Sequence, residues 1–378
     1  MRIGFDVRPF LKKETGVGIY FKNLLFALSK LDYDNHYYLF SSSWKDRFSH
    51  DKIPPFKRLC FRDFHYPVRL INELWYRWGW PPLDRLFKTD LDLTHSPTPL
   101  LLPTKGKKIV TVYDLFFLDF PEFGNREARR YFARKMNESL ARADGVVTIS
   151  QFTKDQVLER YALDETKMHV IHLGINHDRW RSAKKDEIGL VQQTYNLPSS
   201  FILFVGALEP RKNLGRLLEA VKRIHDSREK IPLVIVGREG QDSDRLMKKI
   251  NELNLQEHII FLGYMEEREL RCVYRLATLL VVPSLREGFG LPVLEAMASQ
   301  RPIAASSAPA LPEIIQDAAL FFDPDDPEDM AEKILRVLSD NELREDLIQK
   351  GQRRVLDFNW EKTAEQTLAI YESVTGDQ

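Results

Sequence analysis

Residues 279–296 read LLVVPSLREGFGLPVLEA, an apolar run followed by a glycine-containing loop and a helix-forming segment. The run at 279–283 predicts a buried β-strand. Pro292 fits the first turn of a helix, where its missing N–H has no partner to lose. A strand that is apolar throughout, followed by a loop and a helix, is typical of a parallel sheet covered by helices on both faces.

The same alternation runs through both halves of the chain. The expected strands cover residues 3–7, 37–41, 92–95, 108–112, 145–148, 201–205, 233–236, 259–261 and 279–283. The expected helices cover residues 17–29, 127–143, 214–225, 243–253, 267–277 and 360–373. We therefore predict an α/β fold of two Rossmann-like, doubly wound parallel-sheet domains facing a cleft.

The 378 residues are enough for two domains. We expect the first at 1–176 and the second at 201–359. The polar stretch 177–200 lacks strand character and is interpreted as the linker. The last helix, within 360–378, carries Trp360 and Tyr371 and must pack against another element, for which we expect the first domain.

Composition excludes several classes of protein. The sequence is 43% hydrophobic, and it has no apolar run of the roughly 20 residues that a membrane span requires. Its 55 basic and 55 acidic residues balance, which argues against a general nucleic-acid binder. Residues 1–176 hold 28 Lys/Arg against 21 Asp/Glu, so this half either faces an anionic partner or has an ordinary solvated surface. The cysteines, Cys60 and Cys272, and the absence of a secretory signal at the start predict a cytoplasmic location.

In an open parallel sheet, ligands bind at the carboxyl ends of the strands. After the strand at 201–205 come Gly206 and then Glu209-Pro210-Arg211-Lys212-Asn213. Arginine offers a fork for two oxygens and lysine a compact charge, so Arg211 and Lys212 predict a diphosphate site. Two exposed cations without a ligand are disfavoured at a helix start, because they oppose its positive end.

The loop after residue 283 gives the strongest signal. Gly288 and Gly290 expose backbone amides before a helix, which suits an anion. Glu287 and Glu295 lie on either side, spaced to accept hydrogen bonds from ligand hydroxyls. For Glu295 alone, an acidic residue that favours the helix N-terminus is the alternative.

Gly16-Val17-Gly18 opens a helix after residue 7 and suits a phosphate as well. A dinucleotide fingerprint needs a third glycine where Phe21 stands, so this segment argues little for NAD; a plain helix start is the alternative.

With these motifs, the sequence resembles the retaining glycosyltransferases of family 4, which have the GT-B fold, and in particular bacterial enzymes of polysaccharide assembly. The resemblance rests on E-G-F-G-L-P-V-L-E at 287–295, on 209–213, on Gly16-Val17-Gly18, on 307–313 and on Phe358-Asn359-Trp360-Glu361. It implies an acceptor-binding first domain and a nucleotide-sugar-binding second domain. The last helix is implied to return to the first domain.

The resemblance also implies roles for single residues. Glu287 would hold donor-sugar hydroxyls, Glu295 the ribose, and Arg211 with Lys212 the diphosphate. The remaining donor-site residues expected on this basis are Gly16, Gly18, Gly206, Gly237, Tyr264, Met265, Gly288, Phe289, Gly290 and Leu291. Tyr113-Asp114 stands where the family commonly has His-Asp, which leaves Asp114 either as a catalytic-site residue or as a loop cap.

The expected reaction needs no metal and no cofactor. The donor is GDP-mannose, with UDP-glucose next, and the acceptor is a saccharide, free or lipid-linked. One alternative is a metal-dependent GT-A glycosyltransferase, suggested by Asp90-Leu91-Asp92. Others are a sugar-nucleotide-binding protein without turnover and a pyridoxal-dependent phosphorylase.

Residues 57–88 hold seven Lys/Arg against three Asp/Glu. Trp75, Trp78 and Trp80 lie in the same stretch. This combination predicts peripheral contact with an anionic membrane at its cytoplasmic face, with core packing of the tryptophans as the alternative.

Overall fold

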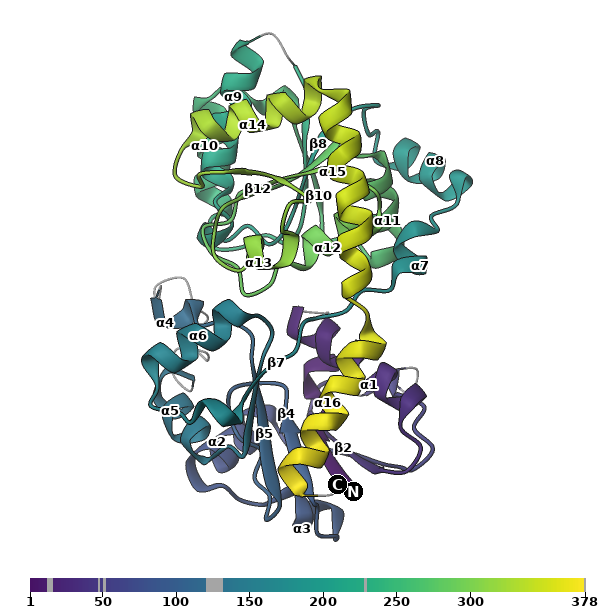
Figure 1. Cartoon of the computed structure of the whole chain (residues 1–378), viewed down its shortest axis with the longest axis vertical. Coiled ribbons are helices and arrows are strands. Elements are labelled where there is room, and N and C mark those ends of the chain that lie inside the picture. Colours follow the sequence, from purple (N-terminus) through teal and green to yellow (C-terminus); the bar gives the residue numbers. More distant parts are fainter. Residues whose placement is uncertain (12–15, 47, 50–51, 120–131, 228–229, 377–378) are drawn as a thin grey trace. The chain divides into compact units, whose positions relative to one another are not determined.

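The computed structural model describes residues 1–378 except 12–15, 47, 50–51, 120–131, 228–229 and 377–378 (Figure 1). The chain divides into two compact units. Unit 1 comprises Met1–Gly174 and Trp360–Gln378, and unit 2 comprises Ile175–Asn359. Each unit is described by itself.

Unit 1 is a parallel sheet with helices on its faces. Its strands are β1 (Arg2–Asp6), β2 (His36–Ser42), β3 (Leu59–Phe64), β4 (Leu93–Ser96), β5 (Lys107–Val112), β6 (Gly145–Thr148) and β7 (Met168–Val170). Its helices are α1 (Gly16–Leu31), α2 (Val68–Trp78), α3 (Leu83–Phe87), α4 (Phe116–Asp119), α5 (Ala133–Arg142), α6 (Gln151–Arg160) and α16 (Trp360–Thr375), with short 3₁₀ turns at Arg8–Phe10 and Glu165–Lys167. The strand order is β3-β2-β1-β4-β5-β6-β7.

Unit 2 repeats this plan. Its strands are β8 (Ile202–Val205), β9 (Leu233–Val236), β10 (Ile259–Gly263), β11 (Leu279–Val282), β12 (Ile303–Ser306) and β13 (Leu320–Phe322), in the order β10-β9-β8-β11-β12-β13. Its helices are α7 (His177–Arg181), α8 (Lys185–Thr194), α9 (Leu214–Asp226), α10 (Ser243–Glu252), α11 (Glu267–Leu276), α12 (Leu291–Ala298), α13 (Leu311–Ile315), α14 (Pro327–Ser339) and α15 (Asn341–Arg354), with 3₁₀ turns at Pro210–Lys212, Gln256–His258 and Val355–Asp357.

The predicted α/β fold with two parallel sheets is confirmed, since every strand pair in both sheets is parallel. Helix α9 shows how the pattern works: Leu214, Leu217, Leu218, Val221 and Ile224 recur at helical spacing and are buried against the sheet. In each sheet the strand order reverses beside the first strand, between β1 and β4 in unit 1 and between β8 and β11 in unit 2. These switch points are where open α/β sheets bind ligands.

One expectation needs correction. Residues 177–200, expected to be a linker, form α7 and α8 in unit 2, and α8 packs against α11. The helix expected at 127–143 is described only from residue 133 onward, as α5, and its first part lies outside the described residues. No helix in the described part of the chain is long and apolar enough to cross a bilayer.

Helix α16 packs against α1 in unit 1 (Figure 1). The buried His95 on β4 contacts the Tyr371 hydroxyl of α16 through Nδ1 at 2.7 Å and the Thr111 hydroxyl of β5 through Nε2 at 2.8 Å. Burial lowers the pKa of His95 to about 3, so the ring is neutral and joins the helix to the sheet as a hydrogen-bonding group.

Candidate functional site

The two loops at the switch point of unit 2 are joined to each other by hydrogen bonds. The Leu285 amide, after β11, donates to the Arg211 carbonyl, after β8, at 2.9 Å. The Asn213 amide group donates to the carbonyl of Pro283 at 3.0 Å and to that of Pro324 at 2.7 Å. Asn213 has φ 55°, which turns the chain from the Pro210–Lys212 turn into α9. The backbone thus holds Arg211, Lys212 and the loop of Glu287 in one place.

Glu287 lies at the centre of this cluster and is buried. Its Oε1 accepts hydrogen bonds from Lys212 Nζ at 2.5 Å and from Ser284 Oγ at 2.6 Å. Its Oε2 lies 3.3 Å from an Arg211 guanidinium nitrogen, and Arg211 Nε also donates to Glu209 at 2.8 Å. The predicted pair of cations is therefore present, but each cation is bound to a carboxylate.

The protonation state of Glu287 follows from these contacts. Burial alone raises the pKa of a carboxyl group. Here the charges of Lys212 and Arg211, with hydrogen bonds from Lys212 and Ser284, outweigh burial and lower the pKa of Glu287 to about 2. Glu287 is thus a fixed carboxylate at neutral pH, and its Oε2, which has the longer contact, is the oxygen better placed to accept a hydrogen bond from a ligand.

The glycine loop leads from Glu287 into α12. Gly290 has φ 97°, and a Cβ atom there would come within 2.8 Å of the Leu311 side chain. The backbone conformation therefore favours glycine, and a larger residue would also require the Leu311 methyl group to move. Gly288, Phe289 and Leu291 belong to the same turn, and Phe289 is buried edge-on against Phe358. The loop places backbone groups at the N-terminus of α12, as the sequence predicts.

Glu295 lies one turn into α12, partly buried, and its Oε2 accepts a hydrogen bond from the Tyr274 hydroxyl at 2.8 Å. Burial raises the pKa of Glu295 to about 7; the Tyr274 hydrogen bond opposes the shift without cancelling it. The two glutamates of the motif thus differ: Glu287 is ionised across the neutral range, whereas Glu295 titrates within it.

Three glycines bring the ends of β8, β9 and β10 together. The Gly237 amide donates to the Gly263 carbonyl at 2.8 Å, and a Cβ atom on Gly237 would lie 1.8 Å from the Gly206 carbonyl oxygen. Beyond Gly263, Tyr264 is exposed, with the Arg238 guanidinium 4.4 Å from its ring centre, while Met265 is buried. Gly206, Gly237, Tyr264 and Met265, which the resemblance places in the donor site, therefore lie at the same end of the unit 2 sheet as the Glu287 cluster.

Three polar residues at the carboxyl ends of the unit 2 strands were not predicted from the sequence. Ser284 and Tyr274 hold the two glutamates, and Asn213 ties the loops together. Ser284 stands three residues before Glu287, which was the available signal. Tyr274 comes from α11, and no spacing in the sequence relates it to Glu295.

The residues of unit 1 that the sequence analysis assigned to a functional site lie at the carboxyl end of the unit 1 sheet. Gly16 and Gly18 open α1, and nothing would meet a Cβ atom on Gly16, so space does not require that glycine. The Asp114 carboxylate accepts a hydrogen bond from the Phe116 amide at 3.1 Å, as a residue that caps a loop does. Tyr113 is buried edge-on against Tyr20.

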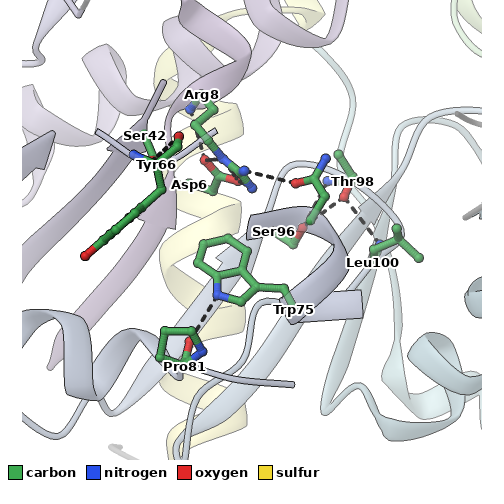
Figure 2. Close-up of polar contacts among 10 residues, drawn as sticks. Asp6, Arg8, Ser42, Tyr66, Trp75, Pro81, Ser96, Thr98 and Leu100 are labelled. Carbon is green, nitrogen blue, oxygen red and sulfur yellow. Dashed lines mark hydrogen bonds and ion pairs between the residues drawn. The ribbon is translucent and has the colours of Figure 1, made fainter. Parts of the chain in front are cut away.

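A polar cluster that the sequence did not reveal occupies the switch point of unit 1 (Figure 2). Arg8 is buried, donates to Asp6 at 2.6 Å and to the Asn72 side-chain oxygen at 2.9 Å, and lies 4.8 Å from the centre of the Trp75 ring. Ser96, at the end of β4, contacts Thr98 at 3.2 Å. Unit 1 thus offers carboxylate, guanidinium, amide and hydroxyl groups at this edge.

Asp90 and Asp92, the basis of the GT-A alternative, lie at the amino ends of the strands of the unit 1 sheet. Asp92 precedes β4 and binds the backbone amide and the guanidinium of Arg2 at 2.6 and 2.8 Å. Asp90 pairs with Lys105 at 3.3 Å on the surface. Across the described residues, no group of three or more His, Cys, Asp or Glu side chains is arranged to hold a metal ion.

Known proteins are similar to this chain in sequence and in fold. The family described as "Glycosyl transferases group 1" matches residues 191–354, and "Glycosyltransferase Family 4" matches residues 15–179. O-antigen chain mannosyltransferase B of Escherichia coli is 29% identical over 278 residues, 73% of each chain. O-antigen chain mannosyltransferase RfbU of Salmonella typhimurium is 29% identical over 259 residues, 68% of this chain and 69% of its own. Sucrose-phosphate synthase from Thermosynechococcus elongatus shares the fold, with a TM-score of 0.79 at 22% identity and full coverage of both chains.

Proposed function

Because the chain belongs to glycosyltransferase family 4, we propose that it transfers mannose from GDP-mannose to a saccharide acceptor with retention of anomeric configuration, in cell-surface polysaccharide assembly. The observation that carries this proposal is the ionised Glu287 between Lys212, Arg211 and Ser284 at the unit 2 switch point. UDP-glucose is the second donor considered.

In the proposed reaction, unit 2 binds the donor and unit 1 the acceptor. Glu287 Oε2 accepts a hydrogen bond from a donor-sugar hydroxyl, and Glu295 accepts hydrogen bonds from the ribose. The charges of Arg211 and Lys212 stabilise the diphosphate, together with the backbone of residues 288–291 and of Gly206. Tyr264 and Met265 are proposed to lie near the base, and Gly237, Gly16 and Gly18 are proposed as further donor-binding residues.

The bond between the anomeric carbon and the phosphate oxygen breaks, and the acceptor oxygen bonds to that carbon from the face that the phosphate leaves. The acceptor proton passes to an oxygen of the departing diphosphate. No separate base is needed, so the protein's main contribution is electrostatic. Asp114 is proposed to orient the sugar or the acceptor, although its contact with the Phe116 amide supports a structural role equally.

The names of two relatives support mannose as the transferred sugar and O-antigen chains as the kind of acceptor. We propose a saccharide or lipid-linked saccharide acceptor, a cytoplasmic location and peripheral contact with the membrane. The polar cluster of Asp6, Arg8 and Asn72 supports acceptor binding by unit 1, because such groups pair with sugar hydroxyls.

Thermal unfolding with GDP, UDP and ADP, and with their sugar conjugates, tests the donor. A ligand at 100 times its Kd stabilises a protein by about 2.7 kcal/mol, so the correct nucleotide is expected to raise Tm and the others to raise it less. A larger shift with UDP than with GDP would contradict GDP-mannose. Transfer or hydrolysis of the stabilising donor separates an enzyme from a protein that binds sugar nucleotides without turnover.

A further inference from the structure

Helix α2 and the turn after it divide the aromatic residues of the 57–88 segment between the core and the surface. Trp75 is 3% exposed, packs against Phe40 with ring centres 4.8 Å apart, and donates its indole N–H to the Pro81 carbonyl at 3.0 Å (Figure 2). The expectation that Trp75 contacts a membrane is therefore wrong. Trp78 and Trp80 are 69% and 50% exposed.

The buried Trp75 stabilises the turn that carries the exposed Trp78 and Trp80. Gly79 has φ 62° and its amide donates to the Trp75 carbonyl at 3.0 Å, which ends α2 and reverses the chain. The hydrogen bond from Trp75 then ties the far side of the turn, at Pro81, to the helix. Trp78 and Trp80 are thus presented to solvent by an ordered turn.

Each exposed indole has an arginine over its ring. The guanidinium carbon of Arg77 lies 5.7 Å from the Trp78 ring centre, and that of Arg85 lies 5.4 Å from the Trp80 ring centre. Both arginines are exposed. Pairs of this kind suit a lipid headgroup layer, where the indole settles among the headgroups and the guanidinium meets phosphate.

The outer face of α2 extends this surface. Leu70 and Arg77 are seven residues apart, two helical turns, and both are exposed, as is Arg69. The acidic residues of the segment offset only part of the positive charge. Asp84 is buried and accepts the backbone amides of Leu91 and Lys105, and Glu73 pairs with Arg77.

We propose that Arg69, Leu70, Arg77, Trp78, Trp80 and Arg85, the Trp78–Trp80 surface, dock unit 1 on an anionic lipid bilayer. This inference deepens the proposed function, because it names the surface that would bring the enzyme to a lipid-linked acceptor. Charge complementarity selects a bilayer as the occupant, since exposed aromatic and aliphatic side chains alternate here with unburied positive charge.

Sedimentation of the full chain with vesicles tests the surface. We expect binding to phosphatidylcholine vesicles containing phosphatidylglycerol, weaker binding at high salt, and little binding to phosphatidylcholine alone. Trp78→Ser with Trp80→Ser is expected to lower the partition coefficient by about tenfold or more, because interfacial burial of two indoles is lost. Arg85→Gln is expected to lower it roughly fivefold.

Matched controls are available in the chain. Trp44→Ser removes another exposed tryptophan of unit 1, and Lys248→Gln removes an exposed charge on α10 of unit 2. Neither is expected to change binding. Loss of binding in the controls equal to that in the Trp78–Trp80 variants, or no binding by the wild-type chain at low salt, would overturn the proposal.

Nucleotide-induced stabilisation of the same variants keeps this test separate from the proposed function. If the variants lose vesicle binding and keep the nucleotide response, both the folding of the variants and the surface assignment are supported. If the nucleotide panel fails while vesicle binding behaves as expected, the donor proposal fails and the surface stands. Reduced transfer to a water-soluble saccharide with unchanged vesicle binding would overturn the docking role and indicate a saccharide-binding face.

Discussion

Glu287 is ionised although it is buried, because Lys212, Arg211 and Ser284 surround its oxygens. Its nearest cations are the groups expected to meet the donor diphosphate. In the proposed site, the carboxylate and the diphosphate would share Arg211 and Lys212, with the donor sugar between them. In this proposal the two loops need few polar groups, because Arg211 and Lys212 each interact with both Glu287 and the diphosphate.

Replacement of Arg211 tests the electrostatic part of the mechanism. Arg211→Ala is expected to lower kcat by about 10²- to 10³-fold, because a preorganised charge beside the leaving group is lost. Lys212 and Ser284 still hold Glu287, so the variant is expected to fold. Arg223→Ala, an exposed position in the last turn of α9, is the control and is expected to leave kcat unchanged. Near-wild-type turnover of Arg211→Ala would contradict the assignment.

Glu295 gives a prediction with a definite pH dependence. Its pKa is about 7 in the folded chain against an ordinary 4.5, so folding disfavours ionisation. The stability associated with the neutral form is present below pH 4.5 and is lost as pH rises through 7. Glu295→Gln is therefore expected to stabilise the protein by about 2 to 3 kcal/mol at pH 8 and to change little near pH 4.5.

Urea unfolding at the two pH values measures this difference, with Glu365→Gln on the exposed side of α16 as a control. Equal effects of Glu295→Gln at both pH values would contradict the raised pKa. Nucleotide affinity gives a second readout. The same variant is expected to bind the nucleotide more weakly above pH 7, because a neutral amide replaces the carboxylate that accepts the ribose hydroxyls.

Among the elements, α16 depends on a buried hydrogen bond. Tyr371→Phe removes the hydroxyl that contacts His95 Nδ1 and leaves a buried ring nitrogen without that partner. The expected cost is about 1 to 3 kcal/mol in the free energy of unfolding. Tyr33→Phe, at a half-exposed tyrosine, is expected to cost far less. A negligible effect of Tyr371→Phe in urea unfolding would show that the hydroxyl is not part of the anchor.

The central elements could be predicted from the sequence because their apolar runs follow the periods of buried strands and amphipathic helices. The strands that escaped prediction are β3, β7, β12 and β13. Strands β3 and β7 form the edges of their sheet, and β3 contains Arg62 and Asp63, so its pattern is not apolar. Strand β12 contains two alanines, and β7 and β13 have three residues each. These segments are ordered by pairing with neighbours, which local pattern does not report.

Some features of the candidate site could likewise be predicted from the sequence, and others could not. Glu287, Arg211 and the glycines belong to loops whose position after a strand places them at the carboxyl end of the sheet, and Glu295 lies in the first part of the helix that follows one of these loops. The ion pairs that occupy Arg211 and Lys212, and the contact between Tyr274 and Glu295, form only when separate elements pack. The three tryptophans at 75, 78 and 80 make the point most directly, because a similar composition yields one core residue and two surface residues. The register of α2 and the turn at Gly79 decide which is which.

At the scale of the whole molecule, two sheets with the same reversal of strand order give the chain two switch points, the positions at which open α/β sheets bind ligands. Unit 2 uses cations and glycines at its edge, which suits a nucleotide diphosphate. Unit 1 uses the Asp6–Arg8 cluster, which suits hydroxyls. A transferase must bind a donor and an acceptor, and the GT-B fold has one switch point for each because it contains two sheets of the same topology.

This architecture predicts turnover that does not depend on a divalent metal. In the proposed site, Arg211 and Lys212 would supply the positive charge that a metal supplies beside a diphosphate. Asp90 and Asp92 lie before β4, away from the carboxyl ends of the strands. Full activity is expected in excess EDTA. Asp92→Asn is expected to keep kcat while lowering stability slightly, since it weakens the half-exposed pair with Arg2. Activity that strictly requires manganese or magnesium and is lost in Asp92→Asn would contradict both the proposed diphosphate site and its independence of metal.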